Sequence, residues 1–277
     1  MSIPKYHHYV PICHLKGFTD SASKFCVYQK NTKKLLRNQK PDNHFGQNHL
    51  NTHYEKSGSK DVSLEHELST LEARTAPLFE RIRKISNNVF KPQLNYEDKL
   101  KFAEYFYNQF SRHPDFFDDT HSEQQVASHL AQFIAESGYE LTSNEKAQML
   151  SSDEVKRIRQ NAIVATRRTT IQSTIARLAS FDFAIAYSKS ADLIIGDNPI
   201  AHFIQTEQIP FNNWMPISLR TAIAPTFPLK CGTQYIELSK QQTAEINFKI
   251  LEKSSRLVAT KDEKVLRQIT NYKKTTT

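Results

Sequence analysis

Cysteine is scarce in this 277-residue chain, with only Cys13, Cys26 and Cys231. Their number is odd and no pair has the CxxC spacing, so the sequence indicates neither a disulfide framework nor a zinc knuckle. We therefore expect a reducing, intracellular environment. A chain of this length can bury a sizeable hydrophobic core without covalent cross-links.

Glycine is also rare, with six residues in the whole chain. Walker, GxGxxG and GxSxG motifs are all absent, and few glycines are left to form a loop that cradles phosphate. Enzymes that bind ATP or a dinucleotide in the usual way are therefore disfavoured.

Long apolar runs are missing as well. No run approaches the roughly 20 residues that span a bilayer, and the opening MSIPKYHH lacks the apolar core of a signal peptide. We expect a soluble, cytoplasmic protein that does not bind a membrane.

Positive charge is present and is concentrated near the amino terminus. The formal net charge is +8, and residues 1–60 contain ten Lys or Arg against three Asp or Glu. Within them, FCVYQ and KLLRN predict two strands joined by a turn at residues 30–32, and residues 39–60 predict a loop. A localised basic region attracts nucleic acid or another polyanion, although a lysine-rich hairpin can also simply be solvated. The candidate substrate-binding residues are Tyr9, Lys16, Lys33, Lys34 and Arg37.

The middle of the chain has a helical pattern. From Ser63, apolar residues recur at alternating spacings of three and four, with Pro77 as an expected kink or break. Asn95 is the expected cap of a second helix that ends before Pro114. The sequence of residues 123–150 also predicts helix. The SSDE sequence at 151–154 predicts the start of one long helix that continues to Leu178.

The last third of the chain has the pattern of strands. FDFAIAYS and DLIIGDNPI predict a hairpin, and TAIAPT and RLVAT predict further strands with a helix near residues 240–253 between them. The expected class is therefore α+β, mainly helical with a small, mostly antiparallel sheet. We expect one domain over residues 1–277, with a basic segment and hairpin (1–60), a helical middle (61–180) and a β-rich part (181–260).

One candidate site residue is Asp197, in the sequence GDNP at residues 196–199. Gly196 permits a sharp exit from a strand, and Asn198 is kept out of the helical region by the proline after it. Many enzymes place catalytic carboxylates at strand ends. The alternative is that Asp197 forms an Asx turn at the start of a loop.

Further candidates lie on the two predicted helices. Glu65 and Glu72 are seven residues apart, so both lie beside the leucine stripe, where a carboxylate can reach a pocket or be solvated. Gln109 and Arg112 occupy positions i and i+3 in the last turn of the aromatic helix. Arg112 lies roughly 160° around the helix from Phe110 and is expected to point away from the apolar stripe. Its interaction with the helix dipole is a sufficient structural reason for an arginine there.

The segment YHHYVP at residues 6–11 places two histidines between tyrosines. A histidine there is suited to acid–base chemistry or metal binding. The other nearby histidines show no HExxH or HxH spacing, so the indication of a metal site is weak. They are His14, His44, His49 and His53.

Taken in order, these motifs resemble the bacterial domain-of-unknown-function family 4238 over about residues 6–260. Residues 8–11 (HYVP) and 15–18 (LKGF) match its amino-terminal motif HYVPxxxLKxF, FCVY matches a short strand, and Leu71-Glu72 and the QxxR pattern of Gln109 and Arg112 match its helices. The family's SDNP strand end resembles GDNP here, with Gly196 in place of serine. Residues 216–218 and Asn247 resemble two later motifs.

The resemblance implies that YHHYVP is docked into the fold, with His8 rather than His7 as the important residue. It also implies a cleft lined by predicted catalytic residues, and the missing serine at 196 would remove a hydroxyl from that cleft. The predicted catalytic residues are His8, Glu72, Gln109, Arg112, Asp197 and Asn198.

Three functional hypotheses remain open. The first is a nuclease-like hydrolase of a bacterial defence or toxin-type system, in which Arg112 stabilises developing charge and His8 with Asp197 or Glu72 transfers a proton or binds Mg²⁺ or Mn²⁺. The second is a non-catalytic module that recognises nucleic acid or a phage protein, with the same residues as a buried hydrogen-bond network. The third is hydrolysis or transfer on a small nucleotide. A protein partner encoded by a neighbouring gene is compatible with each of them.

Overall fold

The computed structural model describes residues 5–84, 91, 93–138, 140–169, 171–203, 211–226 and 232–275. The chain divides into two compact units, each built from separate stretches of sequence. Unit 1 comprises Met1–His7, Gln47–Ser69 and Pro114–Thr170, and unit 2 comprises His8–Gly46, Thr70–His113 and Ile171–Thr277. Helices and small, mostly antiparallel sheets confirm the α+β class. The single domain stays a prediction.

Charge is distributed unevenly between the units. Unit 1 has 9 Lys or Arg against 13 Asp or Glu, a net charge of −4, whereas unit 2 has 28 against 16, a net charge of +12. The basic character of the chain therefore belongs to unit 2, which includes most of the basic amino-terminal region.

Unit 2 contains two sheets. The larger has the order β12 (Gln234–Leu238), β7 (Phe183–Ser188), β11 (Thr221–Pro225), β10 (Asn213–Pro216) and β9 (Ala201–His202), and only the β12–β7 pair in it is parallel. The smaller is antiparallel, in the order β3 (Lys34–Gln39), β2 (Phe25–Gln29), β13 (Leu257–Thr260) and β8 (Ile195–Gly196).

The predicted hairpins have different outcomes. Strands β2 and β3 pair as predicted, with Gln29 opposite Lys34 across the turn. The hairpin predicted from FDFAIAYS and DLIIGDNPI is wrong, because β7 pairs with β11 and β12 whereas β8 pairs with β13. Every residue of β7 is buried, which is typical of a central strand with neighbours on both sides.

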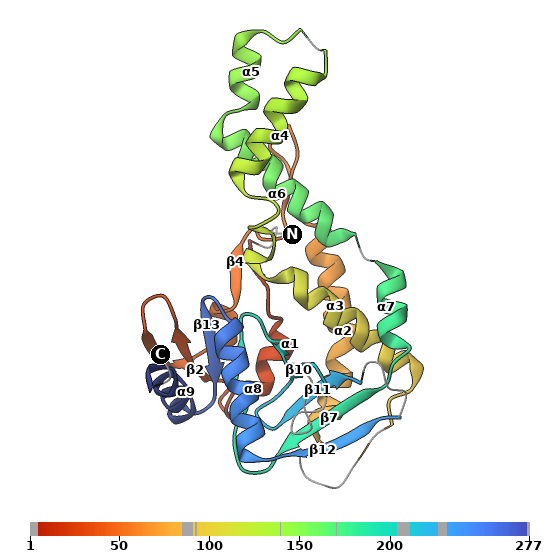
Figure 1. Ribbon diagram of the computed structural model, residues 1–277, viewed down its shortest axis with the longest axis vertical. Helices are drawn as coiled ribbons and strands as arrows, with labels where there is room; N and C mark the ends of the chain where they lie inside the picture. The colour runs from red at the N-terminus through yellow and green to blue at the C-terminus, as the bar shows by residue number, and fades with distance from the viewer. Residues whose placement is uncertain are drawn as a thin grey trace. The chain divides into compact units, whose positions relative to one another are not determined.

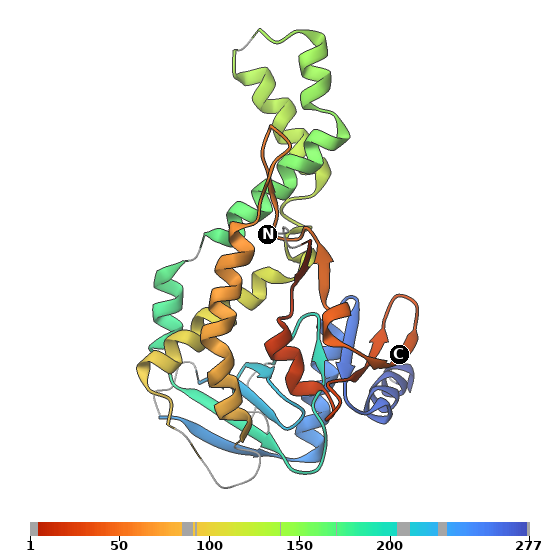
Figure 2. The same cartoon turned by 180° about the vertical axis from the view of Figure 1, so that it is seen from behind.

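The core of unit 2 lies between two helices and the larger sheet. Helix α2 (Ser63–Arg83), whose first seven residues belong to unit 1, passes Pro77 without ending, and helix α3 (Tyr96–Arg112) begins at the capping box predicted at Asn95. Both helices lie over the sheet (Figures 1 and 2). Phe79, Phe102 and Phe106 pack with Phe183 and Ile185 in one buried cluster, and each such side chain contributes about 1.5–3 kcal/mol.

The remaining helices of unit 2 are shorter than α2 and α3. They are α1 (Ile12–Leu15), the 3-10 helix η1 (Lys16–Phe18), α7 (Gln172–Ala179), α8 (Lys240–Lys253) and α9 (Glu263–Thr275). Helix α9 lies beside β2 and β13, next to the β2–β3 hairpin (Figures 1 and 2). Strands β11 and β13 and helix α8 confirm the elements predicted from TAIAPT, RLVAT and residues 240–253.

Unit 1 is mainly helical, with α4 (Glu123–Glu136), α5 (Ser143–Met149) and α6 (Ser152–Arg168). The long helix predicted to continue to Leu178 is wrong, because α6 ends at Arg168 and α7 begins at Gln172. The predicted loop at 39–60 contains a 3-10 turn at 41–43 and short strands: β4 (Gly46–Asn48), which pairs with β1 (Tyr6–His8), and β5 (His53–Tyr54), which pairs with β6 (Lys60–Asp61). In the described part of the chain, no helix is long and apolar enough to cross a bilayer.

Candidate functional site

Several of the predicted site residues meet around the last turn of helix α3 in unit 2. Gln109 Nε2 donates to the backbone carbonyl of Tyr9 over 2.7 Å, and Arg112 forms an ion pair with Glu72 of α2. The next residue, His113, places Nε2 3.8 Å from Oδ2 of Asp197. We call Tyr9, Glu72, Gln109, Arg112, His113 and Asp197 the α3 brace.

The ion pair of the brace is mostly buried. The side chain of Arg112 is 3% exposed and that of Glu72 is 24% exposed. The expectation that Arg112 points away from the apolar stripe is wrong, because Arg112 is buried on the same face of α3 as the core residue Tyr105, whereas Phe110 is 40% exposed. On this face α2 meets Arg112 through Glu72. Removing one partner of such a pair leaves a buried charge without compensation, which destabilises a protein strongly. The pair is thus sufficient to explain why these two residue types occur at 72 and 112.

Cys13 lies near this pair and is not activated by it. Burial, together with the negative charge of Glu72, raises the pKa of Cys13 to about 11 against the opposing charges of Arg83 and Arg112. The thiolate is the nucleophilic form of cysteine. Cys13 is therefore a neutral thiol near pH 7 and not a nucleophile.

His14, on α1, is a structural histidine that the sequence analysis did not identify. Its Nε2 donates to the carbonyl of Pro216 over 2.7 Å, which leaves Nδ1 to accept from the hydroxyl of Tyr105 at 3.0 Å. Burial lowers the pKa of His14 to about 3, the hydrogen bond to Pro216 opposes this shift, and the charge of Arg83 adds to it. The ring is therefore neutral and joins α1, α3 and β10. No sequence spacing reveals this role, because Pro216 lies 202 residues away.

Asp197 follows β8 and accepts hydrogen bonds from four backbone N–H groups. They belong to Asn198 (3.0 Å), Ser255 (3.1 Å), Arg256 (2.5 Å) and Leu257 (3.0 Å). Burial acts to raise the pKa of Asp197, but the hydrogen bond and charge of His113 and the backbone N–H groups outweigh it, so the pKa is lowered. The ionised carboxylate thus joins the end of β8 to the segment that enters β13.

Ser255, His113 and Asp197 share a neighbourhood without forming a nucleophilic triad. Ser255 Oγ lies 3.3 Å from Nε2 of His113, and Asp197 Oδ2 lies 3.8 Å from the same nitrogen. A triad requires the carboxylate on one ring nitrogen and the nucleophile on the other. This geometry therefore does not activate Ser255. His113 itself was missed by the sequence analysis, although it follows the QxxR pattern directly.

The YHHYVP segment is held in place mainly through its backbone and its second tyrosine. Tyr9 donates its backbone N–H to the carbonyl of Phe45 over 2.9 Å, and its ring meets the ring of His113 edge to face at 6.1 Å. His8 is half-buried, in unit 2. In unit 1, His7 is fully buried and its Nδ1 accepts from the backbone N–H of Asn51 at 2.9 Å. That His8 matters more than His7 stays a prediction.

The two carboxylates predicted on one face of α2 have different partners in different units. Glu65, in unit 1, accepts from the side chain of Asn51 over 2.7 Å, whereas Glu72 pairs with Arg112 in unit 2. Asn198 donates its backbone N–H to Asp197 and accepts weakly from Ile200. Glu65 therefore does not belong to the α3 brace.

The packing around Gly196 leaves no room for the serine that the family's SDNP motif has at this position. A Cβ atom at 196 would lie 2.0 Å from Oγ of Ser254 and 2.9 Å from Cγ2 of Ile250. Ser254 donates its hydroxyl to the carbonyl of Ile250 over 2.7 Å. The hydroxyl of Ser254 thus occupies the position where the side chain of a serine at 196 would lie. Asn247, also part of the resemblance, accepts from the backbone of Ile194 at 2.9 Å.

The predicted substrate-binding cations lie on the surface of unit 2. Lys16, Lys33, Lys34 and Arg37 are exposed. Arg37 forms an ion pair with Glu263 of α9, and Arg267 lies 3.6 Å from the same carboxylate. Helix α9 therefore adds Lys264 and Arg267, both exposed, to the cations of the hairpin. We call the β2–β3 hairpin and α9 the basic face. Its α9 half was missed because no predicted contact linked the two ends of the chain.

Across the described ranges, no three His, Cys, Asp or Glu side chains gather as a metal site would require. Bound Mg²⁺ or Mn²⁺ stays a prediction. A family model described as "Protein of unknown function (DUF4238)" matches residues 6–264, nearly the whole chain. The chain belongs to this family, which confirms the resemblance. No match to the chain was found among curated proteins or solved structures.

Proposed function

We propose that this member of the DUF4238 family is a non-catalytic module that binds nucleic acid through the basic face of unit 2. The observation that carries the proposal is the separation of two sets of polar residues. Exposed cations lie on the β2–β3 hairpin and α9, whereas the residues of the α3 brace form internal hydrogen bonds and ion pairs.

The charge of unit 2 supports a polyanion as the partner. A net charge of +12 attracts phosphate over a distance, and the exposed Lys34 and Lys264 can contact phosphates at short range. Nucleic acid is a polyanion that presents many phosphates to such a surface. Phosphate contacts carry little sequence information, so we expect binding that depends strongly on salt and weakly on sequence.

The test compares charge reversals in the two units by fluorescence anisotropy with a labelled 20-base oligonucleotide. We expect the variant K34E/K264E to weaken binding at least about tenfold and to reduce the salt slope by about 2, because two phosphate contacts are lost. The matched control K146E/K156E reverses two exposed lysines of unit 1 and should bind like the wild type. Equal losses in both variants, or no binding by the wild type, would overturn the proposal.

A nuclease-like hydrolase is the second candidate, and one observation favours it. Oε1 of Gln109 is buried, and no hydrogen-bond donor in the described residues reaches it. It lies on the same helical turn as Arg112, whose partner Glu72 is partly exposed. A bound molecule would satisfy such an acceptor. Metal-dependent cleavage of the same oligonucleotide would favour this candidate over the binding module. A role in bacterial defence stays a prediction under either function.

A further inference from the structure

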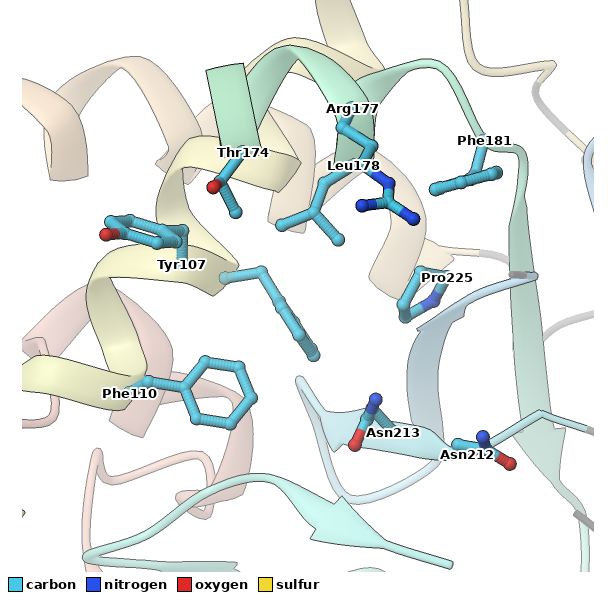
Figure 3. Close-up of a pocket in the computed structure, with 10 residues that line it drawn as sticks. Tyr107, Phe110, Thr174, Arg177, Leu178, Phe181, Asn212, Asn213 and Pro225 are labelled. Atoms are coloured by element: carbon cyan, nitrogen blue, oxygen red, sulfur yellow. The ribbon is translucent and has the colours of Figure 1, made fainter. Parts of the chain in front are cut away.

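Unit 2 contains a pocket of about 380 Å³ that is separate from the basic face and from the α3 brace residues described above. It lies between the end of α3, helix α7 and strands β10 and β11 (Figure 3). Its walls are mainly apolar, from Phe106, Phe110, Leu178, Phe181 and Pro225. Ligand pockets typically combine such walls with a few placed polar groups.

An exposed aromatic ring forms one wall. Phe110 is 40% exposed, whereas Phe106, one turn earlier on α3, is buried. Phe106 supports it edge to face, with ring centroids 5.3 Å apart. The exposed part of the Phe110 ring can contact a flat ligand, and the contact with Phe106 favours one orientation of the ring. Aromatic platforms of this kind stack well on planar heterocycles.

The polar groups of the pocket favour an anionic ligand. Figure 3 shows the guanidinium of Arg177 and the amide of Asn213 at the hollow. Arg177 is the charged side chain among the described lining residues, which include no Asp or Glu. Oδ1 of Asn213 lies 2.7 Å from Nδ1 of His202, so this oxygen accepts from the ring and the amide nitrogen is the donor end of the side chain.

A second pocket, in unit 1, has a different chemistry. It is lined by Lys156, Arg157 and Arg159 but also by Glu123 and Asp153. Arg157 already pairs with Glu154, and Arg159 with Asp118. Its lining therefore carries charges of both signs, unlike the pocket between α3 and α7, which we call the α3–α7 pocket.

We infer that the α3–α7 pocket binds a nucleotide, with the base stacked on Phe110 and the phosphate at Arg177. The base edge accepts a hydrogen bond from the amide of Asn213. The volume suits one base with its sugar and phosphate. The same chemistry is offered by a free mononucleotide and by one unpaired base of a strand.

The test is calorimetric titration of the full chain with each of the four 5′-mononucleotides, with adenosine and with inorganic phosphate. We expect at least one mononucleotide to bind at least about tenfold more tightly than adenosine or phosphate, because base and anion both contribute. F110A and R177Q should each weaken that binding about tenfold or more. The matched controls F133A, an exposed phenylalanine of unit 1, and R74Q, an exposed arginine of unit 2, should not change it.

Several results would overturn the inference: no mononucleotide binds, adenosine binds as tightly as the mononucleotides, or F110A and R177Q leave binding unchanged. R177Q removes an exposed side chain, so the test does not depend on how F110A folds. A five-base strand separates the two sources. Loss of its binding in F110A supports a strand base as the ligand, whereas loss only in K34E/K264E supports a free mononucleotide. Failure of the basic-face proposal leaves the mononucleotide titrations unaffected.

Discussion

The two units use their residues in contrasting ways. Unit 2 has a large apolar core, a buried polar brace and a net charge of +12, whereas unit 1 has a net charge of −4 and two helices, α4 and α5, without a fully buried residue. The fold's stability and its attraction for anions therefore reside mainly in the same unit. Buried polar groups such as Arg112 and Asp197 stabilise the fold, whereas exposed cations such as Lys34 attract anions.

Truncating one aromatic side chain in each unit tests the contrast in core packing and has the largest expected effect. Phe102 is fully buried among the aromatic residues of unit 2, whereas Phe133 on α4 is 59% exposed. F102A should lower the free energy of unfolding by about 4 kcal/mol and F133A by less than about 0.5 kcal/mol. Urea unfolding followed by circular dichroism measures both. Similar losses would contradict the assignment of the main core to unit 2.

Replacing the carboxylate of the brace should also have a large effect. D197N keeps the shape of the side chain but removes the charge that accepts from four backbone N–H groups. We expect a loss of about 3 kcal/mol, because buried donors lose a charged acceptor. The melting temperature of D197N against wild type checks this. An unchanged melting temperature would mean that Asp197 does not serve as a structural acceptor.

The Glu72–Arg112 pair should matter more than a comparable pair on the surface of the same unit. R112Q leaves Glu72 without its cation, and we expect a loss of about 3 kcal/mol. The control R74Q removes the partner of Glu104, but the side chain of Arg74 is half exposed, so the loss should be below about 1 kcal/mol. Parallel thermal melts compare the two variants. If R74Q costs as much as R112Q, burial does not distinguish the pairs.

Acidification should weaken the protein through His14. A group whose pKa falls on folding binds its proton more readily in the unfolded chain, so stability decreases as the pH falls below about 6.5, the ordinary value. With a folded pKa of about 3, lowering the pH from 7 to 5 should cost about 2 kcal/mol. Urea unfolding at both pH values should show this loss in the wild type and a clearly smaller one in H14Q. Equal losses in both proteins would exclude His14 as the source.

Local structure was predictable where a short stretch of sequence determines it. The cap at Asn95, the β2–β3 hairpin and the strands at 221–225 and 257–260 follow from nearby residues. The predicted extension of α6 is wrong because the helix ends at Arg168, and its C-cap Thr169 has a non-helical backbone conformation.

The site was predictable as a set of residues but not as a set of contacts. Gln109 and Arg112 were expected together because they are three residues apart on one helix. Their partners, Tyr9 and Glu72, come from other elements of the fold. Asp197 was expected at a strand end, but three of its donors lie about 60 residues later, at 255–257. Strand β8 was expected to pair with β7, but it pairs with β13, about 60 residues later. Such contacts depend on the tertiary fold and leave no periodic signal in the sequence.

The most direct test of the central claim, that the α3 brace is structural, is the rate at which wild type and E72Q cleave labelled DNA and RNA with Mg²⁺ or Mn²⁺. Glu72 is the partly exposed carboxylate of the brace. The assay is run at a temperature at which circular dichroism shows both proteins folded. The structural account predicts no cleavage by either protein and a lower melting temperature for E72Q. Cleavage by the wild type that is lost in a fully folded E72Q would contradict it.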